Sequence, residues 1–209
     1  MNRILVATAD EMQTAPDILD NMFRFRHKVF HDRLGWDVAS DAGREIDGFD
    51  RLNPVYMVAR NRTGVVEGCW RLLPTTGPYM LKDTFPELLQ DEPAPVASDI
   101  WELSRFAAES PDSGDLAQAA VSPVTFVMFQ AMVDFAINNG IRQYVTVTSV
   151  ALERLLRRMG MPVSRFGDGK AMRIGKVLTV ACRIEINTAM LRVVYPDRVF
   201  KDDDNEAAA

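Results

Sequence analysis

A chain of 209 residues, 47% of them hydrophobic, is long enough to bury one sizeable core and too short for two domains to be expected. Its net charge of −5 excludes the strongly basic surface of a general nucleic-acid-binding protein. Apolar runs fall short of the roughly 20 residues that cross a bilayer, and residues 1–8 lack the apolar core of a signal peptide. We therefore expect a cytoplasmic protein with one domain over residues 1–200 and an acidic, disordered tail over 201–209.

The first half of the chain predicts a strand, a helix, a loop and a hairpin. Residues 4–8 are typical of a strand, and residues 16–34 carry apolar side chains at helical spacing. Residues 37–53 are rich in Asp, Gly and Ser and predict a long surface loop. Two β-prone runs, 56–60 and 65–73, flank a turn-forming segment and predict an antiparallel hairpin. Prolines interrupt the next stretch, where residues 81–89 could form a short helix before a strand over 101–107.

The second half predicts alternating helices and strands. Ser122 and Pro123 supply an N-cap and a first-turn proline for a largely buried helix over 124–137. A strand over 143–150, a helix over 151–159 and a strand over 177–186 follow. This order predicts an α/β fold, a single domain with a mixed, twisted sheet flanked by helices. The two cysteines, Cys69 and Cys182, lie in apolar runs and are expected to be buried, inert thiols.

A set of charged residues could form one site in the first half of the chain: Arg26, Asp47, Asp50, Arg71, Glu102 and Arg105. Taken singly, each could equally be a solvated surface charge. Glu102 and Arg105 are three residues apart, so in a regular strand they would point to opposite faces. We therefore expect a local irregularity in this strand, with Glu102 facing a cleft and Arg105 tied to the N-terminal loop.

Order and spacing of several motifs make the pattern specific. Trp101-Glu102-Leu103-Ser104-Arg105-Phe106 is the strongest, and matching segments occur at 26–30, 35–37, 45–50, 71–81, 85–86, 145–148 and 163–167. With these motifs the chain resembles the LuxI family of acyl-homoserine-lactone synthases, and within it the LasI branch, over nearly its whole length.

The resemblance implies a GCN5-related N-acetyltransferase-like fold and an acyltransferase that makes a quorum-sensing signal. An acyl chain would pass from acyl carrier protein to the amine of S-adenosylmethionine, which is a substrate and not a cofactor. Lactone closure would then release N-acyl-L-homoserine lactone, 5'-methylthioadenosine and the free carrier protein. No metal or cofactor and no nucleic-acid or membrane partner is implied, and we expect a monomer.

The resemblance also suggests roles for the charged residues. Glu102 is the candidate base that takes a proton from the substrate amine, with Arg71 and Asp47 as further catalytic candidates. The alternative for Glu102 is an ion-pair partner of Arg71 or Arg105 that orders the strand.

Residues of opposite charge and aromatic residues suit the parts of S-adenosylmethionine. Arg26 and Arg105 would bind its carboxylate or order the loop, and Asp47 and Asp50 would bind its amine or pair with arginine. Aromatic side chains would contact the sulfonium and adenosine end, and the candidates are Phe30, Trp36 and Phe106.

An acyl chain needs an apolar channel, for which the candidates are Trp70, Met80, Leu103, Met128, Met132, Val147 and Thr148. For the methionines, simple core packing is the alternative. The Thr148 hydroxyl could donate to a 3-oxo group, or it could be an ordinary strand threonine. The LasI-like pattern favours medium or long 3-oxo chains, but chain length is not readable from the sequence.

Three arginines, Arg154, Arg157 and Arg158, lie on the polar side of an amphipathic helix and could dock an acidic carrier protein or be ordinary solvated charges. His27 and His31 have metal-ligand spacing, but no further ligand is evident, so a metal site is not expected.

Two rival functions are disfavoured. A coenzyme-A-dependent N-acyltransferase should carry a glycine-rich pyrophosphate loop, whereas residues 110–115 hold one glycine and two acids. A non-catalytic acyl-lactone-binding protein gives no reason for the set of Arg, Asp and Glu residues.

Overall fold

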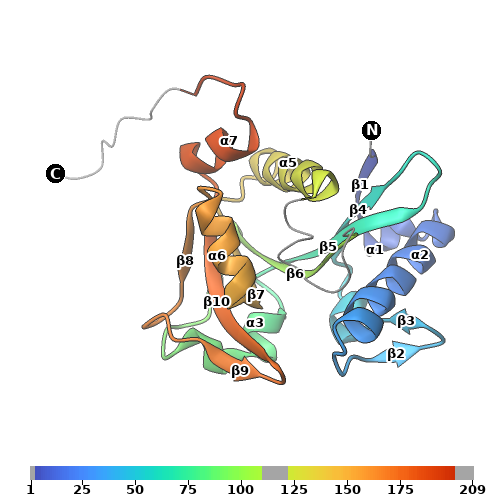
Figure 1. Cartoon of the computed structure of the whole chain (residues 1–209), viewed down its shortest axis with the longest axis horizontal. Helices are drawn as coiled ribbons and strands as arrows, with labels where there is room; N and C mark the ends of the chain where they lie inside the picture. Colours follow the sequence, from blue (N-terminus) through green and yellow to red (C-terminus); the bar gives the residue numbers. More distant parts are fainter. Residues whose placement is uncertain (1–2, 110–121, 201–209) are drawn as a thin grey trace.

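One twisted sheet forms the centre of the structure, a computed structural model that describes residues 3–109 and 122–200 (Figure 1). Its strand order is β1-β4-β5-β6-β7-β10-β8, with β9 also paired to β10. Among the described strands, β6 and β7 run parallel and all other neighbours are antiparallel. The strands span β1 Arg3–Thr8, β4 Val55–Arg60, β5 Val66–Pro74, β6 Ile100–Ala108, β7 Gln143–Ser149, β8 Val163–Arg165, β9 Met172–Ile174 and β10 Val177–Glu185.

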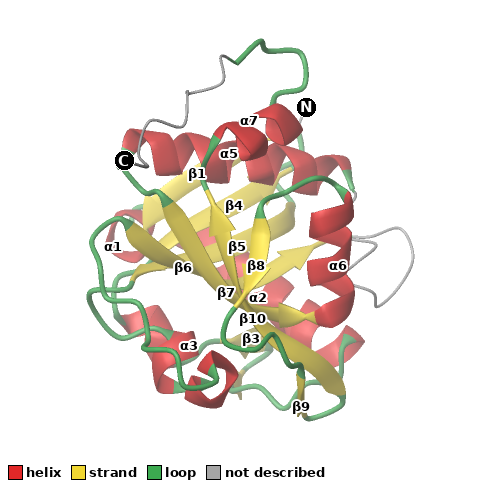
Figure 2. Cartoon of the chain, turned by 90° about the vertical axis from the view of Figure 1, so that its left-hand side faces the viewer, coloured by secondary structure: helices red, strands yellow, loops and turns green. Residues whose placement is uncertain are grey.

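Helices cover both faces of this sheet (Figure 2). On one face lie α5 (Pro123–Asn138), α6 (Val150–Arg158) and α7 (Thr188–Val194). On the other lie α1 (Ala9–Met12), α2 (Pro16–His27) and α3 (Met80–Asp83). Alternation along β4 divides its side chains between the two cores, because Met57 faces α5 whereas Tyr56 and Val58 pack with α2.

The parallel pair β6 and β7 stays together for only part of its length. Pairing runs from Ile100 opposite Gln143 to Leu103 opposite Thr146, although both strands continue beyond those residues. Arg105 has a left-handed backbone, with φ of 54°, and the register between β5 and β6 shifts between Cys69 and Arg71. This bulge re-aims the side chains that follow it, and the irregularity expected at residues 101–106 is confirmed.

Most of the predicted elements are confirmed. The hairpin is β4 and β5, and the predicted N-cap of α5 is present, because the Ser122 hydroxyl accepts from the Thr125 amide at 3.3 Å. No helix in the described ranges is long and apolar enough to cross a membrane. The predicted tail, 201–209, lies outside the described residues.

Two predictions require correction. The segment 37–53 is not a plain surface loop, because it contains β2 (Ser40–Asp41), β3 (Arg44–Glu45) and a 3-10 helix (Gly48–Arg51), and buries Glu45 and Asp50. The predicted helix over 81–89 is split into α3 and a 3-10 helix over Pro86–Leu89, since proline at 86 cannot donate a backbone hydrogen bond.

Some short elements were not predicted at all. They are α1, β8, β9 and α7, each too short to show a clear period in the sequence. The predicted helix over 16–34 is present as α2 and the π-helix that continues it over Lys28–Arg33.

Candidate functional site

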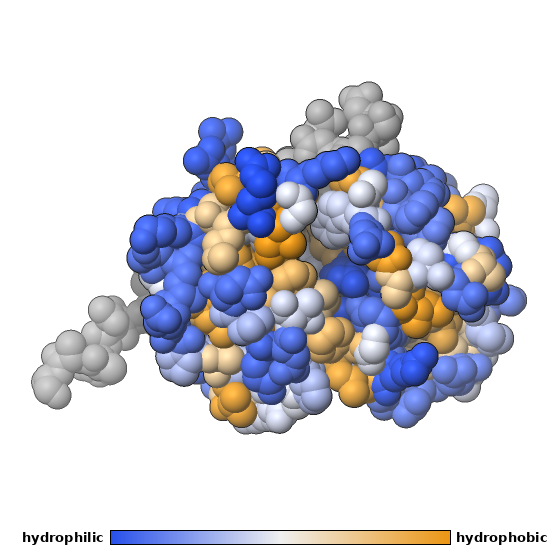
Figure 3. All heavy atoms as spheres, turned by 90° about the horizontal axis from the view of Figure 1, so that it is seen from below, coloured by the Kyte–Doolittle hydropathy of each residue, from blue (hydrophilic) through white to orange (hydrophobic). Residues whose placement is uncertain are grey.

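A cavity of about 630 Å³ occupies the space where β6 and β7 separate. Its lining comes from β6, β7, the inner face of α6 and the segment 34–39. In the space-filling view from below, apolar side chains surround a hollow near the middle of the face, with hydrophilic residues beside them (Figure 3). This size suits a medium-sized organic ligand.

Glu102 is the buried acid of this cavity, with 1% of its surface exposed. Its carboxylate accepts hydrogen bonds from the backbone amides of Met80, at 3.0 Å, and Leu81, at 2.7 Å. Burial raises the pKa of Glu102 to about 7, although the two amides and the nearby arginines act in the opposite direction. Its hydrogen-bond partners in the described structure are these amides, whereas Arg71 and Arg105 act on Glu102 through their charge without a described hydrogen bond, so its role as their charge partner stays a prediction. A carboxyl group with a pKa near neutrality is well suited to accept a proton.

Behind the cavity wall, Arg26 of α2 is held by two acids of the 37–53 segment. Its Nε donates to Glu45 at 2.5 Å, and its Nη1 lies 2.8 Å from Asp50. Tyr56 adds a hydrogen bond to Asp50 at 2.7 Å. Burial alone would raise the pKa of Asp50, but the guanidinium of Arg26 holds it well below its usual range.

Arg71 and Arg105 extend the same network to the central strands. Arg71 donates to Asp47 at 2.5 Å and to Asp50 at 3.0 Å. Arg105 donates to Glu45 at 3.0 Å and lies 2.7 Å from Asp47. The network therefore fastens the 37–53 segment to β5 and β6, and the expectation that Arg105 is tied to the N-terminal loop is confirmed.

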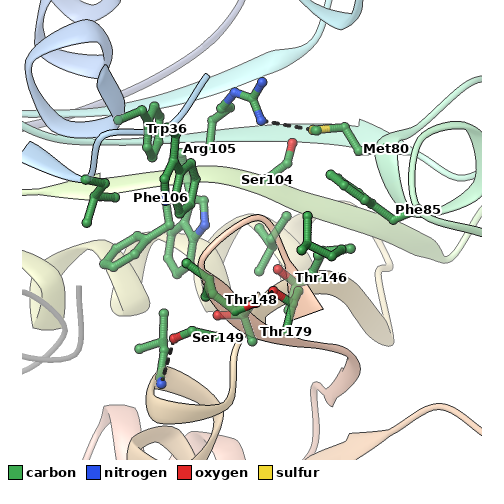
Figure 4. Close-up of a pocket in the computed structure, with 18 of the residues that line it drawn as sticks. Trp36, Met80, Phe85, Ser104, Arg105, Phe106, Thr146, Thr148, Ser149 and Thr179 are labelled. Atoms are coloured by element: carbon green, nitrogen blue, oxygen red, sulfur yellow. Dashed lines mark hydrogen bonds between the residues drawn. The ribbon is translucent and has the colours of Figure 1, made fainter. Parts of the chain in front are cut away.

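Residues predicted to bind S-adenosylmethionine fall into two groups. Trp36, Arg105 and Phe106 line the cavity (Figure 4), as does Phe30, whose ring stacks on that of Trp36 at 5.3 Å. The others do not line the cavity and are engaged in ion pairs: Arg26, Asp47 and Asp50. For these three the geometry shows arginine pairing and loop ordering. Arg71 is likewise fully buried behind the wall.

The predicted acyl channel is mostly found in the lining, which includes Trp70, Met80, Leu103, Met132, Val147 and Thr148. Met128 does not line the cavity, so its assignment to the channel is wrong. It is fully buried in the core, and its sulfur lies so close to Gly68 that a Cβ added there would be 2.5 Å from the sulfur. Helix α5 is apolar on most faces, so the sequence could not show which methionine faces the cavity.

Sequence reasoning missed several residues that line the cavity. They are Thr146, beside Leu103 on the neighbouring strand, and the apolar side chains Phe129, Leu152, Leu156 and Met161. The amphipathic pattern of α6 could have indicated Leu152 and Leu156, since they lie on its buried face.

Helix α6 places its arginines on the outer surface, as predicted. Arg154, Arg157 and Arg158 are exposed. Arg157 lies 3.3 Å from the buried Glu153, which also pairs with Arg165 at 2.9 Å. Glu153 thus anchors the helix to β8, and Arg154 and Arg158 present their charge to solvent.

Other candidate chemistry lies outside the cavity. The rings of His27 and His31 stack at 4.6 Å, and Asp32 lies 2.8 Å from His31, but none of the three lines the cavity. Cys69 and Cys182 are buried as predicted, and burial raises the pKa of each thiol to about 12. Residues 110–115, where a pyrophosphate loop would be expected in a coenzyme-A-dependent enzyme, lie outside the described residues.

The chain matches the family described as autoinducer synthase over residues 10–192. It is 44% identical over 180 residues to an acyl-homoserine-lactone synthase of Pseudomonas aeruginosa, which covers 85% of this chain and 87% of that protein.

Solved structures show the same relationship. The crystal structure of the AHL synthase LasI matches with a TM-score of 0.83 and 40% identity, covering 96% of this chain and 98% of that one. A coenzyme-A-dependent acyl-homoserine lactone synthase, BjaI, solved with SAM and isopentyl-CoA, has a TM-score of 0.79 and 25% identity, covering 94% and 89%. The fold is therefore the expected GCN5-related N-acetyltransferase-like one.

Proposed function

This chain belongs to the autoinducer synthase family, and for this acyl-homoserine-lactone synthase we propose an acyl carrier protein as the acyl donor and S-adenosylmethionine as the acceptor. The signal would be an N-acyl-L-homoserine lactone with a medium or long 3-oxo chain. The main support for catalysis is that Glu102, a buried carboxylate with a pKa near 7, lines the cavity.

Two observations favour a carrier protein over coenzyme A as the donor. The chain is 40% identical to LasI and 25% identical to the coenzyme-A-dependent BjaI. The outer face of α6 carries Arg154 and Arg158, which suit an acidic protein partner. Use of S-adenosylmethionine is supported by the SAM bound to BjaI.

In the acylation step, Glu102 takes a proton from the ammonium group of S-adenosylmethionine, directly or through a water molecule. The free amine then attacks the thioester carbonyl carbon. The new C–N bond forms as the C–S bond breaks, and the carrier protein leaves as a thiolate that is protonated to the thiol. Glu102 suits this step because its pKa of about 7 leaves a large share of the carboxylate ionised at neutral pH.

In the lactonisation step, the carboxylate oxygen of the acylated substrate attacks its own γ-carbon. The carbon–sulfur bond of the sulfonium breaks, and neutral methylthioadenosine leaves. We assign the orientation of that carboxylate to Arg105, which lines the cavity, and the contact with the sulfonium and adenosine to the stacked rings of Phe30 and Trp36.

The acyl chain is assigned to the apolar part of the cavity, between Trp70, Leu103 and the inner face of α6. Thr148 lies on this lining, and within the described residues its hydroxyl makes no hydrogen bond, so it is available to a 3-oxo group (Figure 4).

The test is turnover with a panel of donors. The protein is incubated with S-adenosylmethionine and either acyl carrier proteins or acyl-coenzyme A of matched chains, and the products are identified by mass spectrometry. Acyl-homoserine lactone with methylthioadenosine, formed faster from carrier protein, is the expected result. Faster turnover with coenzyme A would overturn the donor assignment, and an acylated amine without lactone would overturn the second step.

A further inference from the structure

Met80 contacts the proposed base and the two arginines whose charges act on it. Its backbone amide donates to Glu102 at 3.0 Å. Its sulfur accepts from Arg71 Nη2 at 3.0 Å and from Arg105 Nη1 at 3.3 Å. Figure 4 shows the Arg105 side chain turned toward Met80 at the edge of the cavity. An apolar lining residue therefore also joins two cations to the segment that holds Glu102.

The other nitrogens of both guanidinium groups already have stronger partners. Arg71 donates through Nε to Ser104 and through Nη1 to Asp47 and Asp50. The remaining nitrogen of Arg71, Nη2, faces neither a carboxylate nor a hydroxyl and lies against the Met80 sulfur.

Arg105 is arranged in the same way. Its Nε donates to Glu45 and its Nη2 lies 2.7 Å from Asp47, which leaves Nη1 against the Met80 sulfur. A thioether is only a weak acceptor, whereas a carboxylate would bind a guanidinium much more strongly. Glu102 is such a carboxylate in the same pocket, yet its hydrogen-bond partners in the described structure are amides.

We propose that Met80 is a positioning residue whose thioether occupies the remaining nitrogen of Arg71 and of Arg105 and thereby keeps both arginines from pairing with Glu102. The inference rests on the proposed role of Glu102 as the base. An ion pair would stabilise the ionised form of Glu102 and make it a weaker proton acceptor. By binding the two guanidinium groups, Met80 would preserve the basicity of Glu102 that the acylation step needs.

Within the described residues, the charged and titratable groups around Glu102 come from β5, β6 and the turn at α3. Arg71 projects from β5 and Arg105 from β6. Tyr79 lies at the start of α3, and the pKa of its phenol is raised mainly by burial and next by the charge of Glu102. In the adjoining turn, Lys82 donates to the Gly77 carbonyl at 2.9 Å. Opposite Glu102 on β7 is the uncharged Val145. The two arginines are thus the cations whose position matters.

Asp83, also in that turn, accepts from the Tyr79 amide at 3.0 Å and is engaged there. It adds no cation to the surroundings of Glu102.

A direct titration tests the proposal without turnover. The carboxyl signal of Glu102 is followed by ¹³C NMR in the unliganded, glutamate-labelled protein and identified by its absence in Glu102→Gln. In the wild type we expect a midpoint of about 7. In Met80→Leu, which keeps the volume but removes the acceptor, the midpoint should fall by about 1 to 2 pH units as an arginine pairs with Glu102.

Two further variants separate this role from packing. Met80→Gln places an amide oxygen near the sulfur position, and its midpoint should stay close to that of the wild type. Met12→Leu, a buried methionine of α1 away from the cavity, makes the same exchange as a control and should leave the midpoint unchanged.

The results that would overturn the proposal are an unchanged midpoint in Met80→Leu, a wild-type midpoint near that of an ordinary glutamate, or an equal fall in Met80→Gln. Failure of the proposed function would look different. It would appear in the turnover assay, as acylation that survives in Glu102→Gln, whatever the titration of Glu102 shows.

Discussion

Replacing Glu102 by glutamine should change both the activity and the pH dependence of stability. Glutamine has nearly the same shape but neither ionises nor accepts a proton. Without the base, acylation should slow by about 10² to 10⁴-fold. Measured in the wild type, kcat/KM for acylation should fall as pH drops below about 7, because protonation of Glu102 removes the base.

The effect on stability follows from the raised pKa of Glu102. Folding moves this pKa from the ordinary 4.5 to about 7, so between these values the folded protein binds more protons than the unfolded chain. The free energy of unfolding must therefore fall as pH rises through this window. At about 1.4 kcal/mol per pH unit, the full loss is about 3 kcal/mol, of which about 2.5 kcal/mol falls between pH 5 and pH 8.

Urea unfolding of both proteins at pH 5 and pH 8 measures this loss. The wild type should lose about 2.5 kcal/mol more than Glu102→Gln over that interval, because contributions from other titrating groups cancel in the difference. Glu87→Gln, at an exposed glutamate, is the matched control and should behave like the wild type. Equal pH dependence in the wild type and Glu102→Gln would refute the argument that burial raises the pKa of Glu102.

Three further predictions concern the network, the acyl chain and the donor. Arg26→Met should lower the free energy of unfolding by about 3 to 5 kcal/mol, since it leaves two buried carboxylates short of a partner, whereas Arg24→Met, which breaks an exposed pair, should cost at most about 1 kcal/mol in the same urea experiment. Thr148→Val should reduce the preference for 3-oxo over plain acyl chains in competition assays, and an unchanged product ratio would remove Thr148 from the proposal. Reversing the charge of Arg154 and Arg158 should raise the KM for acyl carrier protein several-fold and spare that for S-adenosylmethionine; equal changes in both would contradict docking on α6.

Local patterns were sufficient for the longer elements of the fold. The turn between residues 60 and 65 predicts the β4–β5 hairpin, and Ser122 with Pro123 marks the start of α5, because these signals involve neighbours in the chain. The bulge in β6 was predictable for a related reason. Glu102 and Arg105 cannot both serve one site in a regular strand, and the positive φ of Arg105 resolves that conflict.

Contacts between distant segments were not predictable in this way. Nothing in the composition of residues 37–53 indicates that Glu45 and Asp50 are buried, because their burial depends on Arg26 in α2 and on the arginines of β5 and β6. Met128 and Met132 lie four residues apart on an apolar helix, and only the packing of α5 decides that Met132 lines the cavity while Met128 fills the core.

The sequence alone therefore determined the order of the longer elements, the family and most of the residues at the site, since these depend on residue type and spacing along the chain. Only the tertiary structure decided what each charge does. Glu102 faces two backbone amides and two arginines held back by Met80, and its pKa near 7 arises from that burial. The physical reason is that desolvation and charge–charge interactions depend on distance in space, which residue spacing does not specify.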